Sequence, residues 1–330
     1  MINITEIKYD LAAVTPQGDR LHLNDFYRSL SLEEQPEELA VSLKMEIHNQ
    51  QVDGQWLHQL LPLGGQVYLW ADWGEGQVEV FRGNIRQWFY RTDPLGHLNL
   101  EAYDMLYQLR SKDHRSYAPG TKARVILEDI ASFWKIPLGT VEGPEAELGK
   151  KIFRNRSVAG MMTEVLGEAQ KRGAGEFILR AREGQADIIR AGGNTVIYHF
   201  ESGAGVMNID DQQDIRELIT RVKVFGKERT EKVPPVVAVE DGATEFGILQ
   251  EVLYLDEFDT PAAARKAAEE IIRERGEPRK KRKVTAPDLP FIRKGDKVHI
   301  QAGTLDGYYI VSGVRHEIDR QTMIMEVKDL

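Results

Sequence analysis

Short segments in which apolar and polar residues alternate set the strongest limit on how this chain of 330 residues can fold. In residues 41–47 every second side chain is apolar, so one face of a strand is apolar. Turn residues such as those of 72–76 separate similar segments, as in β-hairpins. These further segments are residues 66–70, 77–82, 84–90 and 97–102, and later 221–226, 291–300, 307–316 and 322–328. The pattern predicts a mainly β protein built as barrels or sandwiches.

Helical spacing of apolar residues is clearest in three segments. Apolar residues at i, i+3, i+4 and i+7 predict a helix over residues 127–134. Ser157 is placed as the N-cap of an apolar stripe over residues 158–169. Pro261 suits the first position of a helix over residues 261–275, which Gly276 ends. Helices are therefore expected in the middle of the chain and once near its end.

Together these segments predict three domains. Residues 1–110 form a first β domain, and residues 111–208 form a small α+β module. Residues 209–330 form a second β domain, on which the helix 261–275 packs. The expected fold class is thus mainly β with an α+β insert, and no internal repeat is visible in the sequence.

Charge and cysteine content exclude several classes of function. The net charge is −9, and residues 1–115 carry 10 Lys and Arg against 17 Asp and Glu, a net charge of −7. An acidic first domain disfavours binding to a phosphate backbone, although it would suit a surface that nucleic acid passes without binding. An acidic face that only keeps the protein soluble is the alternative. The absence of cysteine excludes disulfides, thiolate zinc sites and cysteine nucleophiles.

The sequence contains neither a predicted membrane helix nor a predicted signal peptide. No run approaches the roughly 18 to 20 apolar residues of a membrane helix, so no integral membrane association is expected. The first residues alternate like a strand rather than showing the basic and apolar segments of a signal peptide. We therefore expect synthesis and assembly in a bacterial cytoplasm.

No pattern of catalytic, cofactor-binding or metal-ligating residues emerges. Residues 143–150 are one position too long for a phosphate-binding loop and lack its hydroxyl. The histidines form no i, i+4 pair, and no serine lies in a Gly-x-Ser-x-Gly elbow. We predict a protein that is not an enzyme. The alternative is a peptidoglycan-degrading hydrolase with Glu176 and Asp187 as paired carboxylates, because both flank predicted strands of the middle module.

Two features are candidate interaction surfaces. The first is a run of five cations, for which a nuclear localisation signal, a polar strand beside a charged neighbour and a contact with an acidic partner are the alternatives. The run consists of Arg279, Lys280, Lys281, Arg282 and Lys283. The second is Trp73, which lies in a turn with a glycine beside it and is a candidate interface anchor.

Seven segments carry a resemblance to a known family. They are Phe81–Ile85, Arg221–Gly226, Ala262–Arg275, Ile292–Val298, and the terminal segments Gly307–Val311, Val314–His316 and Met323–Val327. With these segments in order, the chain resembles the central hub proteins of contractile phage tails and phage-tail-like particles. These are the late control protein D and XkdQ/YqbQ-like families.

The resemblance implies a structural role in a virion or tail-like particle. Such hubs are similar in having two tail-tube-like β-barrels in each chain, here residues 1–110 and 209–330. Three copies then form a baseplate ring that adapts the sixfold tail tube to the threefold spike. The implied partners are two further copies, the trimeric tail spike protein, the hexameric tail tube protein, and the tape-measure and baseplate wedge proteins. Sequence-specific binding to nucleic acid is not expected.

Overall fold

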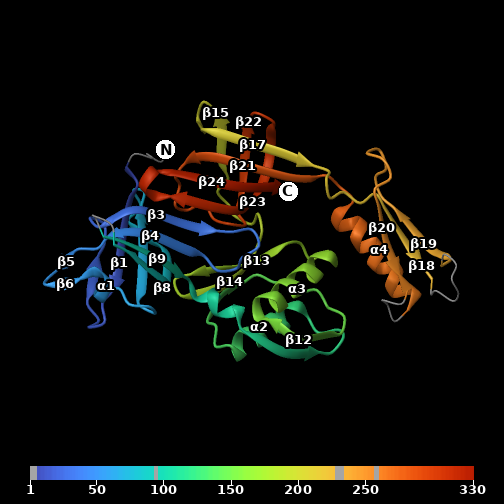
Figure 1. The fold of residues 1–330 in the computed structure, drawn as a ribbon, viewed down its shortest axis with the longest axis horizontal. Coiled ribbons are helices and arrows are strands. Elements are labelled where there is room, and N and C mark those ends of the chain that lie inside the picture. The colour runs from blue at the N-terminus through green and yellow to red at the C-terminus, as the bar shows by residue number, and fades with distance from the viewer. Residues whose placement is uncertain (1–5, 93–95, 227–233, 256–259) are drawn as a thin grey trace. The chain divides into compact units, whose positions relative to one another are not determined.

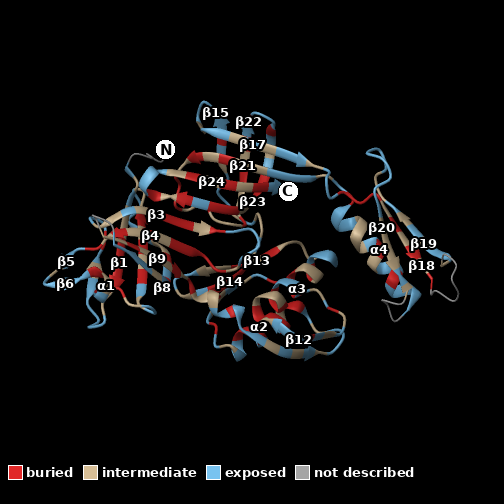
Figure 2. Cartoon of the chain, in the orientation of Figure 1, coloured by how far each residue is buried: buried red, intermediate tan, exposed pale blue. Residues whose placement is uncertain are grey.

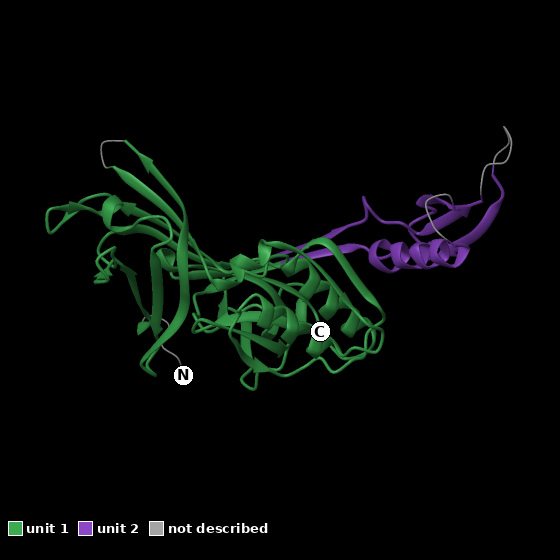
Figure 3. Cartoon of the chain, turned by 90° about the horizontal axis from the view of Figure 1, so that it is seen from below, with its two compact units in different colours: residues 1–209, 283–330 green, residues 210–282 purple. Residues whose placement is uncertain are grey.

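The computed structural model describes residues 6–92, 96–226, 234–255 and 260–330. The chain forms two compact units, which Figure 3 distinguishes by colour. The first unit contains residues 1–209 and 283–330, and the second contains residues 210–282. Strands predominate and helices are few (Figure 1). The expected fold class is confirmed, whereas the expected boundaries at residues 110 and 208 stay a prediction.

Seven strands form the N-terminal β half of the first unit. They are β1 (Lys8–Val14), β2 (Arg20–His22), β3 (Tyr27–Glu34), β4 (Ser42–His48), β7 (Gln66–Asp72), β8 (Gln77–Arg91) and β9 (His97–Tyr103). Their order in the sheet is β3-β4-β9-β8-β7-β1-β2. The small ribbon β5 (Gln51–Val52) with β6 (Gln55–Trp56) and the short helix α1 (Leu57–Leu60) connect β4 to β7. Apolar side chains on one face make the core of this half. Figure 2 shows the buried residues of these strands in red.

Seven further strands form the C-terminal β half. They are β15 (Tyr198–Ser202), β16 (Gly205–Val206), β17 (Asn208–Asp214), β21 (Arg279–Pro287), β22 (Lys297–Ala302), β23 (Leu305–Glu317) and β24 (Thr322–Asp329). Their order is β16-β15-β22-β23-β24-β21-β17. The turn η4 (Ile318–Arg320) connects β23 to β24. A second apolar cluster, with residues such as Val298, Ile300 and Met325, is the core of this half.

The two β halves repeat the same strand order. When the seven strands of each half are numbered along the chain, their order across the sheet is two, one, five, six, seven, four, three in both halves. One difference is the direction of the first strand, since β1 runs antiparallel to β7 whereas β15 runs parallel to β22. The middle module is inserted between the halves, and most of the second unit is inserted between β17 and β21.

The repeat extends to the register of single residues. A β-bulge interrupts the pairing of β8 with β9 between Ile85 and Gln87. The same irregularity interrupts β23 and β24 between Val311 and Gly313. Bulges add one residue at a defined position, so they fix which residues correspond. Ile85 therefore corresponds to Val311, and the residues that follow correspond in turn up to Arg91 and Glu317.

Two matching turns confirm this correspondence. The amide of Gly64 donates to the carbonyl of Ile85 (2.8 Å), as the amide of Gly295 donates to that of Val311 (2.7 Å). Ile85 and Val311 each donate back to the carbonyl of the residue after the glycine, at 2.9 and 2.8 Å. Both glycines have a positive φ, of 82° and 91°, which glycine adopts without strain. The same turn therefore leads into β7 and β22.

Gly83 lies inside a strand instead of separating two. The sequence predicts strands over residues 77–82 and 84–90, but β8 is continuous through both. A Cβ atom at Gly83 would lie 2.4 Å from the carbonyl oxygen of Tyr103. The glycine is thus explained by the close approach of β9 and not by a turn.

The middle module has its own core between helices and short sheets. It contains the 3-10 helix η2 (Met105–Arg110), α2 (Ala123–Phe133) and α3 (Val158–Lys171). Its strands are β10 (Lys112–Tyr117), β11 (Leu138–Val141), β12 (Lys151–Ser157), β13 (Phe177–Arg182) and β14 (Gln185–Arg190). The amide of Gly160 donates to the Ser157 hydroxyl (3.1 Å), which confirms the expected N-cap.

The second unit is a three-stranded sheet covered by one helix. The sheet order is β19 (Val236–Asp241), β18 (Arg221–Phe225), β20 (Gln250–Tyr254), and the helix is α4 (Pro261–Arg275). The helix bounds are those expected from the sequence. Ala264 and Ala268 of α4 pack on Val222 and Val224 of β18. Within the predicted second β domain, the strands that α4 covers are those of this three-stranded sheet.

Candidate functional site

The two β halves meet where β3 pairs with β23. The strands are antiparallel, with Leu32 opposite His316 and Glu34 opposite Val314. All four residues are buried, with exposed fractions between 1% and 6%. This pairing makes one continuous sheet of fourteen strands from the two halves. We call this contact, together with residues 288–296 before β22, the junction site.

A buried ion pair holds the junction site together. Arg293 donates from Nε to Glu34 Oε1 and from Nη2 to Glu34 Oε2 (3.2 Å). Burial by itself raises the pKa of Glu34, but the neighbouring Arg293 guanidinium outweighs it and holds that pKa below its usual range. Glu34 is therefore ionised, and its charge and that of Arg293 neutralise each other out of water.

Lys294 fastens the loop that follows β3. Its Nζ donates to the backbone carbonyls of Gln35 (2.8 Å), Pro36 (2.7 Å) and Glu38 (2.9 Å). Three acceptors match the three donors of an ammonium group. Burial lowers the pKa of Lys294 from its ordinary value. One side chain thus fixes the connection between β3 and β4 against the C-terminal β half.

Arg180 ties the middle module to the same loop. Its Nη2 donates to Asp296 Oδ1 (2.7 Å) and to the carbonyl of Lys294. Arg293 reaches the carbonyl of Ala181 as well, at 3.5 Å. The segment 293–296 therefore contacts the N-terminal β half, the C-terminal β half and the middle module.

A chain of hydrogen bonds crosses the junction site beneath β23. The Tyr9 hydroxyl donates to Asp288 Oδ2 (2.5 Å), while Asp288 Oδ1 lies 2.6 Å from Nδ1 of His316. His316 Nε2 lies 3.1 Å from the carbonyl oxygen of Ile292. Burial and the Asp288 carboxylate raise the pKa of Tyr9, so its hydroxyl stays protonated and donates. His316 is thus a packed imidazole.

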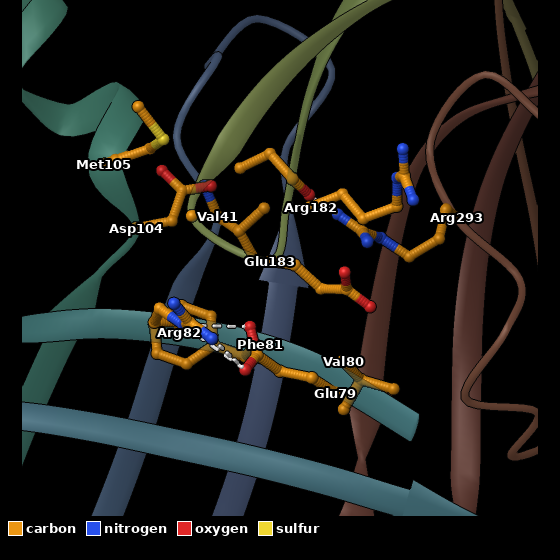
Figure 4. A pocket seen from close by; sticks show the side chains of 12 residues that line it. Val41, Glu79, Val80, Phe81, Arg82, Asp104, Met105, Arg182, Glu183 and Arg293 are labelled. Atoms are coloured by element: carbon orange, nitrogen blue, oxygen red, sulfur yellow. Dashed lines mark hydrogen bonds and ion pairs between the residues drawn. The ribbon is translucent and has the colours of Figure 1, made fainter. Parts of the chain in front are cut away.

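Asp104 occupies the first turn of the middle module beside the junction site. It accepts hydrogen bonds from the amides of Val41 (3.1 Å) and Leu106 (2.9 Å). Burial nevertheless raises the pKa of Asp104 to about 7. Figure 4 shows Asp104 and Arg293 among the side chains that line a cavity of about 20 Å³. This volume is near that of one water molecule, so the cavity has no room for a substrate.

The five predicted cations all lie on β21 and have partners within the chain. Arg279 pairs with Glu217 (2.6 Å), Arg282 with Asp211 (3.6 Å) and Lys283 with Glu326 (3.2 Å). Lys280 and Lys281 are not without partners either. The run is thus a strand with charged neighbours, one of the three alternatives that the sequence left open. Its use as a contact with another protein stays a prediction.

Trp73 lies at the turn between β7 and β8 and is half-buried. Its ring meets the edge of Phe291, with centroids 5.3 Å apart. Phe291 in turn stacks on Tyr198 of β15 at 4.6 Å. Trp73 therefore links the N-terminal β half to the C-terminal β half, and its role as an anchor for another protein stays a prediction.

Glu176 and Asp187 are not arranged as a catalytic pair. Asp187 is buried, accepts the amide of Thr140 (2.7 Å) and pairs with Arg182 (2.7 Å). Glu176 pairs with Lys328 (2.5 Å). In the hairpin β13–β14 the two acids are separated by four residue pairs, roughly 13 Å by the rise of a strand. The carboxylates of glycosidases lie about 5 to 9.5 Å apart.

The residues of the junction site were not singled out from the sequence as a site. Arg293, Lys294 and Asp296 do belong to the segment Ile292–Val298, which carries the family resemblance. The available signal was the charged run Arg-Lys-Gly-Asp-Lys between Ile292 and Val298. In the described part of the chain, no group of acidic or histidine side chains is placed to hold a metal ion. No helix among the described residues is long and apolar enough to cross a membrane.

Comparison with known proteins identifies the family. The sequence matches the model of the YQBQ-like family over residues 31–328. A relative is the phage-like element PBSX protein XkdQ of Bacillus subtilis (strain 168), which is 21% identical over 257 residues. That alignment covers 76% of this chain and 78% of XkdQ. The chain belongs to the YQBQ-like family.

Solved structures of tail proteins share the fold. The 43 kDa tail protein of prophage MuSo2 from Shewanella oneidensis aligns with a TM-score of 0.69 at 12% identity, over 97% of this chain and 98% of that chain. A tail protein of Neisseria meningitidis MC58 aligns with a TM-score of 0.66 at 14% identity, over 97% and 96%. The E. coli c3393 protein, described as a type VI secretion component similar to T4 tail proteins gp27 and gp5, aligns at 0.54 with 8% identity, over 92% and 74%. The fold is that of these phage tail proteins.

Proposed function

We propose that this member of the YQBQ-like family is the central baseplate hub of a contractile phage tail or tail-like particle. Three copies form a ring that joins the sixfold tail tube to the threefold spike. The observation that carries the proposal is the repeated strand order of the two β halves. The shared fold with phage tail proteins supports a structural role and not a catalytic one.

The internal repeat gives one chain the two kinds of contact that such an adaptor requires. Rings of unequal symmetry cannot make equivalent contacts with one another. Three chains with two similar β halves each present six similar surfaces to a hexameric tube. The middle module and residues 210–282 occur once in each chain, so three chains present them as a threefold set. A trimeric spike can bind such a set.

The face of the sheet opposite the core suits a channel wall. The side chains of this face on β4 and β9 are mostly polar, and several of its charges are paired. Lys44 of β4 lies 2.9 Å from Glu33 and 3.6 Å from Glu101, and Lys283 of β21 pairs with Glu326. A surface of paired charges binds neither a polyanion nor an apolar segment strongly. This supports a lumen through which DNA or a tape-measure protein passes.

Co-assembly tests the proposal. The purified chain is mixed with the tail tube protein and the spike protein of the same gene cluster, and the complexes are imaged by electron microscopy. We expect particles in which the chain lies between a sixfold tube and a threefold spike. A chain that binds neither protein, or that binds both as a monomer, would contradict the proposal.

A further inference from the structure

We propose that neighbouring copies join by pairing β17 of one copy with residues 88–91 of β8 in the next. This inference rests on the proposed ring and names the strands that close it. The partner of this surface is therefore a second copy of this chain. The junction site supplies the template, because it shows how one β half binds another within a single chain.

The first side of the contact is the counterpart of β23. Within the chain, β23 binds β3 through residues 314–317. The matching bulges make Trp88–Arg91 the counterpart of these four residues. In β8 this segment pairs with β9 on one side, whereas β7 pairs with β8 only as far as Asn84. In the part of the chain that the structure describes, no strand occupies the position on β8 that β3 occupies on β23.

The second side is the counterpart of β3. β3 and β17 hold the same place in the strand order. β17 is the edge strand of its half, as β3 would be if β23 did not pair with it. Their sequences agree as well. Ser31–Glu37 reads Ser-Leu-Glu-Glu-Gln-Pro-Glu, and Asn208–Asp214 reads Asn-Ile-Asp-Asp-Gln-Gln-Asp. Both read as a polar residue, an aliphatic residue, two acids, glutamine, a variable residue and an acid.

The segment of β8 is more exposed than its counterpart in β23, as expected if its strand partner comes from another copy. Val314 and His316, which bind β3, are 3% and 1% exposed. Their counterparts in β8 are Trp88, which is half-buried, and Tyr90, which is 37% exposed. Partly exposed aromatic side chains on one face of a strand are typical of interfaces. Covering them with a strand of the next copy gives them the environment that β23 already has.

The correspondence fixes the register of the contact. His316 lies opposite Leu32 within the chain, so Tyr90 lies opposite Ile209 of the next copy. Phe89 then lies opposite Asp210, one step along the strand. Arg91 lies diagonally across from the same Asp210, within reach of its carboxylate. In this register Tyr90 meets an aliphatic residue and Arg91 meets an acid.

Engineered disulfides test this register in the full chain. The protein contains no cysteine, so any disulfide comes from the introduced pair. The test variant carries Phe89→Cys and Asp210→Cys, both exposed and therefore tolerant of substitution. Opposite residues of antiparallel strands have Cα atoms about 4.5 to 5.5 Å apart, within the range that a disulfide spans. The control variant carries Phe89→Cys and Gln212→Cys, a diagonal pair about 7 to 8 Å apart, which a disulfide does not span.

The readouts are the covalent species on a non-reducing denaturing gel and the native mass before oxidation. We expect the test variant to shift from the monomer band to the trimer band and the control variant to stay at the monomer band. A native trimer without cross-linked product would overturn this inference and leave the proposed ring intact. Cross-linked ladders beyond the trimer would support the strand pairing and contradict a ring of three. A monomer without cross-links at high protein concentration would overturn both.

Discussion

Replacing Glu34 by glutamine should strongly destabilise the first unit. Glu34→Gln keeps the size and shape of the side chain and removes its charge. The Glu34 and Arg293 side chains are only 6% and 13% exposed, so Arg293 remains buried without its main counter-charge. Breaking a buried pair by removing one partner costs about 3 to 5 kcal/mol. Asp104 and Asp296 also act on Arg293, which places our expectation near 3 kcal/mol, the lower end of that range.

Equilibrium unfolding in urea, followed by tryptophan fluorescence, measures this change. All five tryptophans lie in the first unit, so the signal reports on that unit alone. The matched control is Glu128→Gln, which removes an exposed i, i+4 pair with Arg124 on α2. Exposed pairs contribute little, so the control should leave the unfolding midpoint unchanged. Equal midpoints for the two variants would refute the view that the Glu34–Arg293 pair holds the junction site together.

Three further predictions concern pH, packing and activity. Because the pKa of Asp104 is about 7 when folded and near 3.8 when unfolded, the folded state takes up a proton between these values, and stability falls as pH rises through 7. Asp104→Asn should therefore remove about 2 to 3 kcal/mol from the loss of stability between pH 5 and pH 8, measured by urea unfolding at both pH values; an unchanged pH dependence would contradict this. Gly295→Ala should destabilise by about 1 to 3 kcal/mol more than Gly64→Ala, because both residues have a positive φ but only a Cβ at Gly295 would lie 2.1 Å from Ile178 Cδ1; equal unfolding midpoints would show that Ile178 moves aside without cost. In a peptidoglycan zymogram the purified chain should leave the gel uncleared, since Glu176 and Asp187 are both ion-paired and far apart, and clearing that Asp187→Asn abolishes would refute the non-catalytic role.

Local structure could be predicted from the sequence wherever one residue determines it. Ser157 begins α3, and α4 runs from Pro261 to Arg275, because an N-cap hydroxyl and a proline act within one turn of a helix. The alternation in residues 41–47 identifies β4, because one of its faces lies on the core. Gly83 misled the prediction, since glycine serves equally in a turn and where two backbones approach closely.

The repeat and the junction site could not be predicted in this way. The similar segments at Ser31–Glu37 and Asn208–Asp214 are short, and in the second copy the insertion of residues 215–278 separates β17 from β21. Only the strand order and the matching bulges show that the segments correspond. The contact of Glu34 with Arg293 joins residues 259 positions apart, and no local pattern specifies such a pair.

Electron microscopy of the purified chain tests the central proposal most directly. We expect class averages of a ring with threefold symmetry whose wall contains six similar β layers, two from each copy. Averages that show monomers, or closed rings with another number of copies, would contradict the account of the chain as a trimeric hub built from an internal repeat.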